Sequence, residues 1–251
     1  MGNVFIIGNG FDLDLGLPTK YSDFAKSAYW PDAAPKKLIL NDRVQSNSGI
    51  FRINTTADAP KLEEVIETAR NRETWFDLEK ELLEYAMQYE SGTSNYSHFS
   101  RETPNKVKNN VEYFNKLRNS LNEYILDIEK NHEVRTECMA RYVLDAVAQN
   151  GNFGSIYSFN YTDLKSIAWK LHIEWEIKYT HLHGNVSDGS IILGVDETKL
   201  RKGYESFHKS SSRYYRSHDL YNSLAAAKEI VIFGLSFGSI DYSYFDRFLS
   251  S

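Results

Sequence analysis

The chain has 251 residues, of which 41% are hydrophobic and 25% are charged, and its formal net charge is −5. These fractions are those of a globular protein, and the length suits one sizeable α/β domain or one such domain with a large insertion. The mild negative charge argues against sequence-independent binding to nucleic acid, which needs a basic stripe. The solitary cysteine, Cys138, excludes a disulfide framework and a cysteine-based zinc site.

The start of the chain and its apolar runs give an expectation about location. Residues 1–8 have no basic region, and their apolar run is too short for a signal peptide. No stretch approaches the length that spans a bilayer. We therefore expect a cytoplasmic protein with no membrane partner.

One cluster of basic residues contrasts with the negative net charge of the chain. We expect it to be a solvated loop and helix face, although a local basic patch stays open as an alternative. Its members are Lys199, Arg201, Lys202, Lys209, Arg213 and Arg216.

The first predicted element is a strand over Val4–Ile7, a continuous apolar run of the kind that is buried on both faces of a parallel sheet. A polar stretch over Asn41–Pro60 is typical of a surface loop. Helical spacing of apolar residues then predicts one or two helices over Lys61–Tyr89 and further helices over Lys106–Asn131 and Glu137–Gln149.

Four more apolar runs in the last hundred residues predict further strands of the same sheet: Phe153–Phe159, Ile177–Leu182, Ser190–Leu193 and Glu229–Phe233. The sequence thus indicates an α/β fold with a Rossmann-type parallel sheet and a large helical insertion. We expect residues 1–30 plus 150–251 to form a nucleotide-binding core, and residues 31–149 to form the helical insertion or lid. Because ligands bind at the carboxyl ends of parallel strands, the residues after each run are the candidates for chemistry.

The first candidate is the turn Gly8-Asn9-Gly10 after the first strand. Glycine lets the backbone approach a pyrophosphate at the start of the next helix. The dinucleotide fingerprint needs a third glycine where this chain has Leu13, so the turn is not that of a standard dehydrogenase, and a purely structural turn remains the alternative.

Two later strand ends carry side chains suited to catalysis. Asn160 can orient a water or a ribose hydroxyl; alternatively, the segment is a helix cap in which Asn160, Thr162 or Asp163 holds the free helix amides. His183 is a candidate general base, and if its strand persists, His181 points to the same side of the sheet. A metal site is not expected, because no third ligand accompanies the two histidines.

The last strand end, Gly234 to Asp241, offers glycine and hydroxyl groups that suit ribose or phosphate, although an ordinary turn fits equally. Ser236 sits in the letters G-x-S-x-G. It is disfavoured as a hydrolase nucleophile because the acid and histidine that should follow it are missing.

These pieces in order resemble the bacterial AbiH-like abortive-infection proteins. The resemblance is carried by Phe5-Ile6-Ile7-Gly8-Asn9-Gly10-Phe11-Asp12, Gly16-Leu17-Pro18-Thr19, Tyr21-Ser22-Asp23-Phe24, Trp75-Phe76-Asp77-Leu78-Glu79, Phe159-Asn160-Tyr161-Thr162, His181-Leu182-His183-Gly184 and Gly234-Leu235-Ser236-Phe237 with Asp241, Tyr244 and Phe245.

More distantly, the set is similar to the sirtuin superfamily. That similarity implies a sirtuin-like sheet, an NAD-binding loop and a catalytic pair. It assigns Gly8, Asn9, Gly10, Phe11, Asp12, Gly234 and Ser236 to nucleotide binding, and His183 and Asn160 to catalysis. Thr162 stands where the sirtuin pattern has aspartate. The sirtuin zinc module is absent, and so is the Asp-Phe-Arg sequence that sirtuins carry. Both differences argue against a deacylase.

The resemblances imply an NAD glycohydrolase or ADP-ribosyl transferase of phage defence, with NAD as substrate or ligand and a phage-derived trigger as partner. Two alternatives remain: a nucleotide-binding sensor or scaffold without turnover, and a toxin that acts on RNA or nucleotides with His183 and His181 as acid and base. Homo-oligomerisation is left open.

Overall fold

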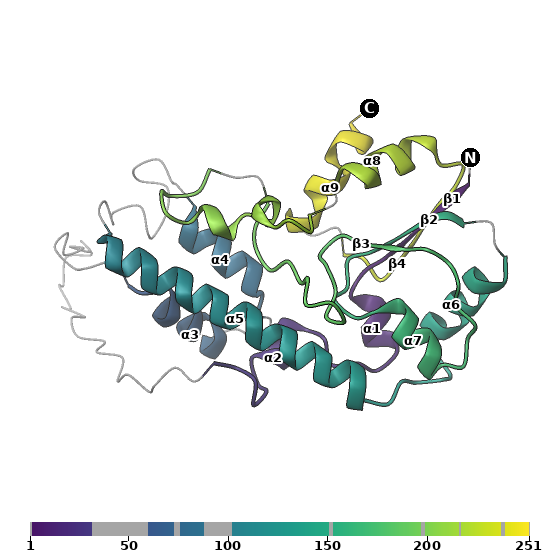
Figure 1. Cartoon of the computed structure of the whole chain (residues 1–251), viewed down its shortest axis with the longest axis horizontal. Coiled ribbons are helices and arrows are strands. Elements are labelled where there is room, and N and C mark those ends of the chain that lie inside the picture. The colour runs from purple at the N-terminus through teal and green to yellow at the C-terminus, as the bar shows by residue number, and fades with distance from the viewer. Residues whose placement is uncertain are drawn as a thin grey trace, which may run out of the picture.

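The computed structural model describes residues 2–31, 60–72, 76–87, 102–150, 153–196, 199–215, 217–236 and 239–250. Within these ranges the chain forms a four-stranded parallel sheet with helices around it (Figure 1). The predicted α/β class with a parallel sheet is therefore confirmed. The predicted loop over residues 41–60 lies outside the described residues except for Pro60.

The sheet has the strand order β3-β2-β1-β4, and each neighbouring pair is parallel. Its strands are β1 (Asn3–Ile7), β2 (Phe153–Ser158), β3 (Thr180–His181) and β4 (Ile230–Phe233). The first, second and last of the predicted strands are confirmed as β1, β2 and β4. The strand predicted over Ile177–Leu182 is reduced to the two residues of β3.

The strand predicted over Ser190–Leu193 is wrong, although its residues are buried as expected. The run folds back beneath the end of β3, where the Ile192 amide donates to the His183 carbonyl at 2.7 Å. Gly184 permits this path. Its φ is +70°, and a Cβ there would lie 2.0 Å from the Ser190 carbonyl oxygen. The run therefore fills the core without joining the sheet.

Most of the helices lie between β1 and β2. They are α1 (Gly10–Asp14), α2 (Tyr21–Phe24), α3 (Leu62–Arg72), α4 (Leu78–Ala86), α5 (Pro104–Asn131) and α6 (Met139–Asn150). The helices predicted over Lys106–Asn131 and Glu137–Gln149 are confirmed as α5 and α6, and the predicted segment Lys61–Tyr89 contains α3 and α4. Within the described parts of the chain, no helix is both long and apolar enough to cross a membrane.

The remaining helical elements follow β2. α7 (Leu164–Lys170) connects β2 to β3, and α9 (Ser239–Leu249) follows β4. Two 3₁₀ turns, η1 (Glu205–Phe207) and η2 (Lys209–Ser211), and the helix α8 (Ser217–Ala226) lie between β3 and β4.

Helices cover both faces of the sheet. Successive side chains of β1 point in opposite directions and therefore pack against different helices. Phe5 and Ile7 belong to a hydrophobic cluster with α1, α6 and α7, whereas Val4 and Ile6 belong to a second cluster with α8 and α9. Figure 1 shows the two groups of helices on opposite sides of the strands. Burial on both faces explains why the strands of this sheet are continuously apolar.

The helices α3, α4 and α5 extend to one side of the sheet (Figure 1) and are called the interstrand helices below. Their apolar residues, such as Leu82 and Leu117, belong to the same hydrophobic cluster as Phe5 of β1. The core is therefore continuous from the sheet into these helices. The division into a core of residues 1–30 plus 150–251 and an insertion of residues 31–149 stays a prediction.

Candidate functional site

A cavity of about 350 Å³ lies at the carboxyl ends of the strands. The chain passes from β1 to β2 on one side and returns to β4 on the other, so the strand order reverses between β1 and β4. Open parallel sheets bind ligands at such a reversal. The wall also includes Glu79 of α4 and Leu121 and Ile125 of α5, so the interstrand helices help to enclose it.

The cavity brings together seven of the nine residues that the sequence predicted for a site. They are Asn9, Gly10, Asp12, Asn160, His183, Gly234 and Ser236. The other two, Gly8 and Phe11, do not line it. Phe11 is fully buried in the hydrophobic core, where its ring packs edge-on against Phe233.

The glycines of the first turn allow it to pack against the turn after β4. A Cβ at Gly8 would lie 2.6 Å from the Leu235 Cα atom, and a Cβ at Gly10 would lie 2.7 Å from the Gly234 Cα atom. The Gly10 amide donates to the Gly234 carbonyl at 2.8 Å. Contact between the two turns therefore accounts for the glycines. Because this amide is occupied, a phosphate here needs other donors.

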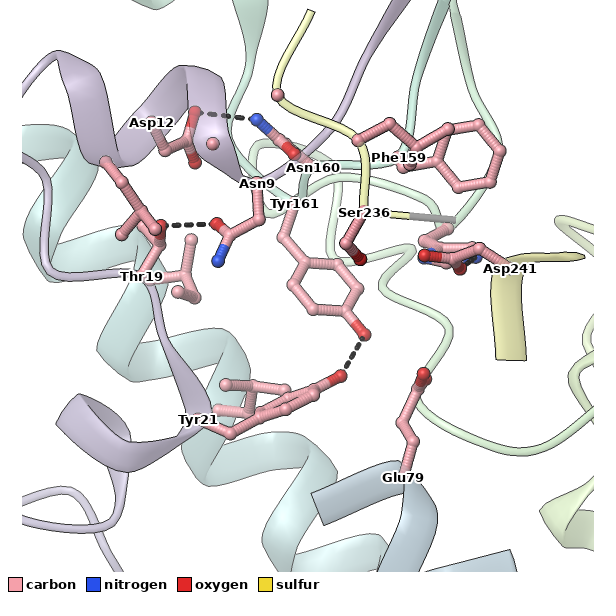
Figure 2. A pocket seen from close by; sticks show the side chains of 17 residues that line it. Asn9, Asp12, Thr19, Tyr21, Glu79, Phe159, Asn160, Tyr161, Ser236 and Asp241 are labelled. Atoms are coloured by element: carbon pink, nitrogen blue, oxygen red, sulfur yellow. Dashed lines mark hydrogen bonds and ion pairs between the residues drawn. The ribbon is translucent and has the colours of Figure 1, made fainter. Parts of the chain in front are cut away.

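Asn9, between those glycines, is one such donor. The Thr19 hydroxyl donates to its side-chain oxygen at 2.6 Å, so the amide nitrogen is the group that Asn9 offers to a ligand (Figure 2). Donors of this kind suit a phosphate or a ribose oxygen.

Asp12, Asn160 and Thr162 form a buried group that we call the Asp12 cluster. The Asn160 amide nitrogen donates to Asp12 Oδ1 at 2.8 Å, and the Thr162 hydroxyl lies 3.0 Å from each carboxylate oxygen. Burial raises the pKa of Asp12 to about 7, although both donors act to lower it. The carboxylate has no cation among these partners, so the two neutral donors take the place of the water molecules that would solvate it at the surface.

The Asp12 cluster orients the Asn160 side chain toward the cavity. Figure 2 shows the amide nitrogen directed at Asp12. The side-chain oxygen of Asn160 is fully buried and has no hydrogen-bond partner in the structure, and only 4% of the residue is exposed. An orphaned buried acceptor costs about 1–3 kcal/mol.

Asp163 and His181 take structural positions beside the cavity. Asp163 accepts from the Ser166 amide at 3.2 Å and so caps α7, and it also accepts from the Tyr179 hydroxyl. Burial acts to raise the pKa of Asp163, but contacts with His181, Tyr179 and Ser166 lower it to about 2. His181 Nδ1 lies 3.0 Å from the Asn160 carbonyl. The alternative of a helix cap therefore holds for Asp163.

His183 has different surroundings from His181, because β3 ends before it. Its ring packs edge-on against Phe159 and lies 5.6 Å from the ring of Tyr244, and the residue is only 6% exposed. Burial lowers the pKa of His183 well below its usual value, and the nearby ammonium of Lys209 lowers it further. The imidazole is therefore neutral at pH 7, as a general base must be.

Lys209 and its neighbours form the second buried group, the Lys209 cluster. Its Nζ lies 3.2 Å from Glu79 Oε2 and 3.3 Å from His183 Nε2, and Asp241 Oδ1 lies 3.9 Å from the same histidine nitrogen. Burial raises the pKa of Glu79 to about 7. Burial acts to lower the pKa of Lys209, but the carboxylates of Glu79, Asp196 and Asp241 raise it. Four ionisable groups thus meet here, and three of them, Glu79, His183 and Asp241, line the cavity.

The sequence interpretation missed Glu79 and Lys209. The expectation of a solvated basic cluster is wrong for Lys209, which is fully buried, and for Arg201, which bonds Glu102 at 3.0 Å and lies over the Tyr85 ring. Glu79 did carry a signal, because it falls three residues before the buried Leu82 on the apolar face of α4. Lys209 carried none, since it lies on a 3₁₀ turn of three residues, which is too short to show a periodic pattern.

Metal ligation finds no support in the described ranges, where no three histidine, cysteine or acidic side chains converge as ligands would. Ser236 and Gly234 line the cavity next to the first turn. The site is therefore built from amide, carboxylate, imidazole and ammonium groups.

Comparison with known proteins identifies the family. No curated protein and no solved structure matches the chain. The family model described as bacteriophage abortive infection AbiH matches residues 4–251, which is nearly the whole sequence. The chain therefore belongs to the AbiH family and is a protein of bacteriophage abortive-infection defence.

Proposed function

We propose that this AbiH protein cleaves NAD⁺ between nicotinamide and ribose, as a hydrolase or by transfer of the ADP-ribosyl group. The observation that carries the proposal is the orphaned side-chain oxygen of Asn160, buried in a cavity that also holds the neutral imidazole of His183. Ribose supplies the hydroxyl donors that this oxygen needs. The sirtuin-like order of the two residues along the chain supports the same substrate.

The size and lining of the cavity fit one half of a dinucleotide. Ligand pockets usually measure about 300–1,000 Å³, so a cavity of about 350 Å³ suits a ribose with its base. Tyr21 and Tyr161 form part of the wall, and their hydroxyls lie 3.2 Å apart (Figure 2). The flat rings of these tyrosines and of Phe159 are suited to an aromatic base.

The charges around the cavity favour a positively charged reactant. Asp12, Glu79 and Asp241 supply three carboxyl groups, whereas Lys209 is the one cation in the two buried clusters. NAD⁺ carries a cationic nicotinamide ring, and cleavage passes through an oxocarbenium-like state, as in glycoside hydrolysis. Ionised carboxylates stabilise developing positive charge without reorganisation, and because burial raises the pKa of Asp12 and Glu79 to about 7, this stabilisation grows as the pH rises through 7.

In the proposed hydrolysis, the C1′–N bond breaks and its electron pair leaves with nicotinamide. A water oxygen forms the new bond to C1′ and loses one proton to Nε2 of His183. Asn160 orients the ribose hydroxyl or this water through its free oxygen. The products are nicotinamide, ADP-ribose and one proton, so the step needs no oxidant or reductant.

Release of nicotinamide from NAD⁺ is the direct test, measured with purified protein, with and without extract of phage-infected cells to supply the trigger. Asn160→Ala and His183→Ala should each lower the rate by about 10²–10⁴-fold, the usual contribution of a positioned acid–base or orienting group. Asn109→Ala and His132→Ala change exposed residues of α5 and its end, and should leave the rate unchanged. Full activity in both site variants contradicts the mechanism.

A second candidate, nucleotide binding without turnover, is favoured by one observation. Lys209 occupies Nε2 of His183, the nitrogen that the reaction needs. Calorimetric binding of NAD⁺ or ADP-ribose with no product after long incubation selects this candidate. The RNA toxin is less well supported, because of the two histidines that it would use as acid and base only His183 lines the cavity.

A further inference from the structure

Lys209 is a buried cation that the proposed chemistry does not use. None of its surface is exposed, and it lies on η2, between β3 and α8. Its Nζ contacts one oxygen of Glu79 and one nitrogen of His183, at 3.2 Å and 3.3 Å. Burying an ammonium is costly unless it is paired and hydrogen-bonded, so these two contacts require an explanation.

We infer that Lys209 is a positioning residue for His183: its ammonium fixes the imidazole proton on Nδ1 and keeps Nε2 as the unprotonated nitrogen, and Glu79 of α4 anchors the ammonium. The inference rests on the proposed function only for its consequence in catalysis. The assignment of the proton itself depends on the contacts alone.

The assignment follows from the donors available. An ammonium group has three donors and no acceptor, so in the contact with Lys209 the histidine nitrogen must be the acceptor. Nε2 therefore carries a lone pair, and the ring proton is on Nδ1. The hydrogen bond between His183 and the backbone of Phe159 is consistent, because a backbone carbonyl needs a donor from the ring.

The groups that face His183 from each element act in opposite directions. Lys209 of η2 opposes the imidazolium, whereas Asp241 of α9, 3.9 Å from Nε2, favours it. Phe159 and Tyr244 contribute apolar ring surface, which also opposes charge. Burial and the ammonium prevail, so the pKa of His183 lies well below its usual value.

Glu79 determines where the ammonium lies. Its other oxygen accepts from the Gly194 amide at 3.4 Å, so the carboxylate is itself held in place. During turnover, the proton that reaches Nε2 displaces the Lys209 contact, and the ammonium remains bound to Glu79. One of the interstrand helices thus supports a residue that the strand ends alone cannot position.

The first test uses the wild-type protein without ligand. Histidine ¹⁵N chemical shifts distinguish the two tautomers, and comparison with His183→Gln identifies the resonance among seven histidines. At neutral pH we expect Nδ1 protonated and Nε2 unprotonated. A proton on Nε2 overturns the inference. Because no substrate is present, this result is independent of whether the protein cleaves NAD⁺.

The second test removes the ammonium. In Lys209→Met, and in Lys209→Met combined with Glu79→Gln, the pH at which His183 titrates should move upward. Lys209→Met alone should move this titration midpoint further than the double variant does, because it keeps the Glu79 carboxylate, which favours the imidazolium form of His183. Lys202→Met changes an exposed lysine of the same segment and should not move it. An unmoved midpoint in both Lys209 variants overturns the inference.

The catalytic consequence has its own readout. If the protein releases nicotinamide, the acid side of the pH–rate profile should shift to higher pH in Lys209→Met, which loss of packing alone does not cause. If no nicotinamide is released, the proposed function fails while the tautomer result stands.

Discussion

The Asp12 cluster and the Lys209 cluster border the same cavity but stabilise their buried carboxylates in different ways. Asp12 has only the neutral donors of Asn160 and Thr162, whereas Glu79 has an ammonium. Both arrangements leave the pKa of the carboxylate raised to about 7 by burial. The first cluster serves to orient an amide and the second to hold a histidine neutral. The comparison shows that two side chains of one cavity can be positioned by different means: Asn160 by neutral hydrogen-bond partners and His183 by a charged group.

The largest expected effect is on the charged cluster. Lys209→Met leaves Glu79 buried without its cation and should lower the free energy of unfolding by about 3–5 kcal/mol, the usual cost of breaking a buried ion pair from one side. The double variant with Glu79→Gln removes both charges and should recover most of that loss. Urea unfolding of the four proteins in this cycle gives the coupling energy.

A double variant that is no more stable than Lys209→Met would break the comparison. It would mean that packing of the lysine side chain, and not its charge, stabilises the second cluster.

A smaller effect is expected in the neutral cluster. Thr162→Val removes one of the two donors to Asp12 and should lower the free energy of unfolding by about 1.5–3 kcal/mol at pH 8, where the carboxylate is charged. Thr162→Ser keeps the hydroxyl and is the matched control. At pH 5 the carboxyl group is protonated, and the loss in Thr162→Val should shrink. A loss that does not depend on pH assigns Thr162 to packing alone.

The smallest expected effect is the pH dependence that Asp12 gives to the free energy of unfolding. The pKa of Asp12 is raised from 3.8 when exposed to about 7 when folded, so between these values the folded state binds more protons. The stability contributed by this group is therefore present at low pH and is lost as pH rises toward 7, by up to about 1.4 kcal/mol per pH unit.

In Asp12→Asn, which keeps an acceptor for Asn160, the slope should become shallower by the part that Asp12 contributes, while the part from Glu79, whose pKa is also raised to about 7, remains. Unfolding free energies of the two proteins at pH 5, 6, 7 and 8 measure the difference. Equal slopes in the two proteins would show that Asp12 is not the group that titrates.

The two clusters also differ in how far sequence could predict them. Asn160 lies just past the end of β2 and Asp12 lies in α1, the helix that follows β1, so their convergence was expected at the carboxyl ends of the strands. Thr162 was read as a helix cap or as a substituted aspartate, and its bond to Asp12 depends on a side-chain direction that spacing does not set.

The Lys209 cluster could be predicted only in part. His183 was expected from its strand end, and a glutamate among the apolar positions of α4 was visible, but its partner was not. Lys209 lies on the short 3₁₀ turn η2, where three residues set no apolar periodicity, and its burial depends on tertiary packing. For the same reason the apolar run at Ser190–Leu193 was misassigned as a strand. Burial alone does not distinguish a strand from a coil that fills the core.

The ion pair between Glu79 and Lys209 joins residues that are 130 positions apart in the chain. During synthesis on the ribosome, Glu79 therefore emerges long before Lys209, the cation that neutralises it. The strands β3 and β4 are likewise made long after β1. Contacts of such long range form late in folding, because the loop between them must close first. The order of synthesis thus keeps the cavity unassembled in the nascent chain until Lys209, β4 and Asp241 have been made.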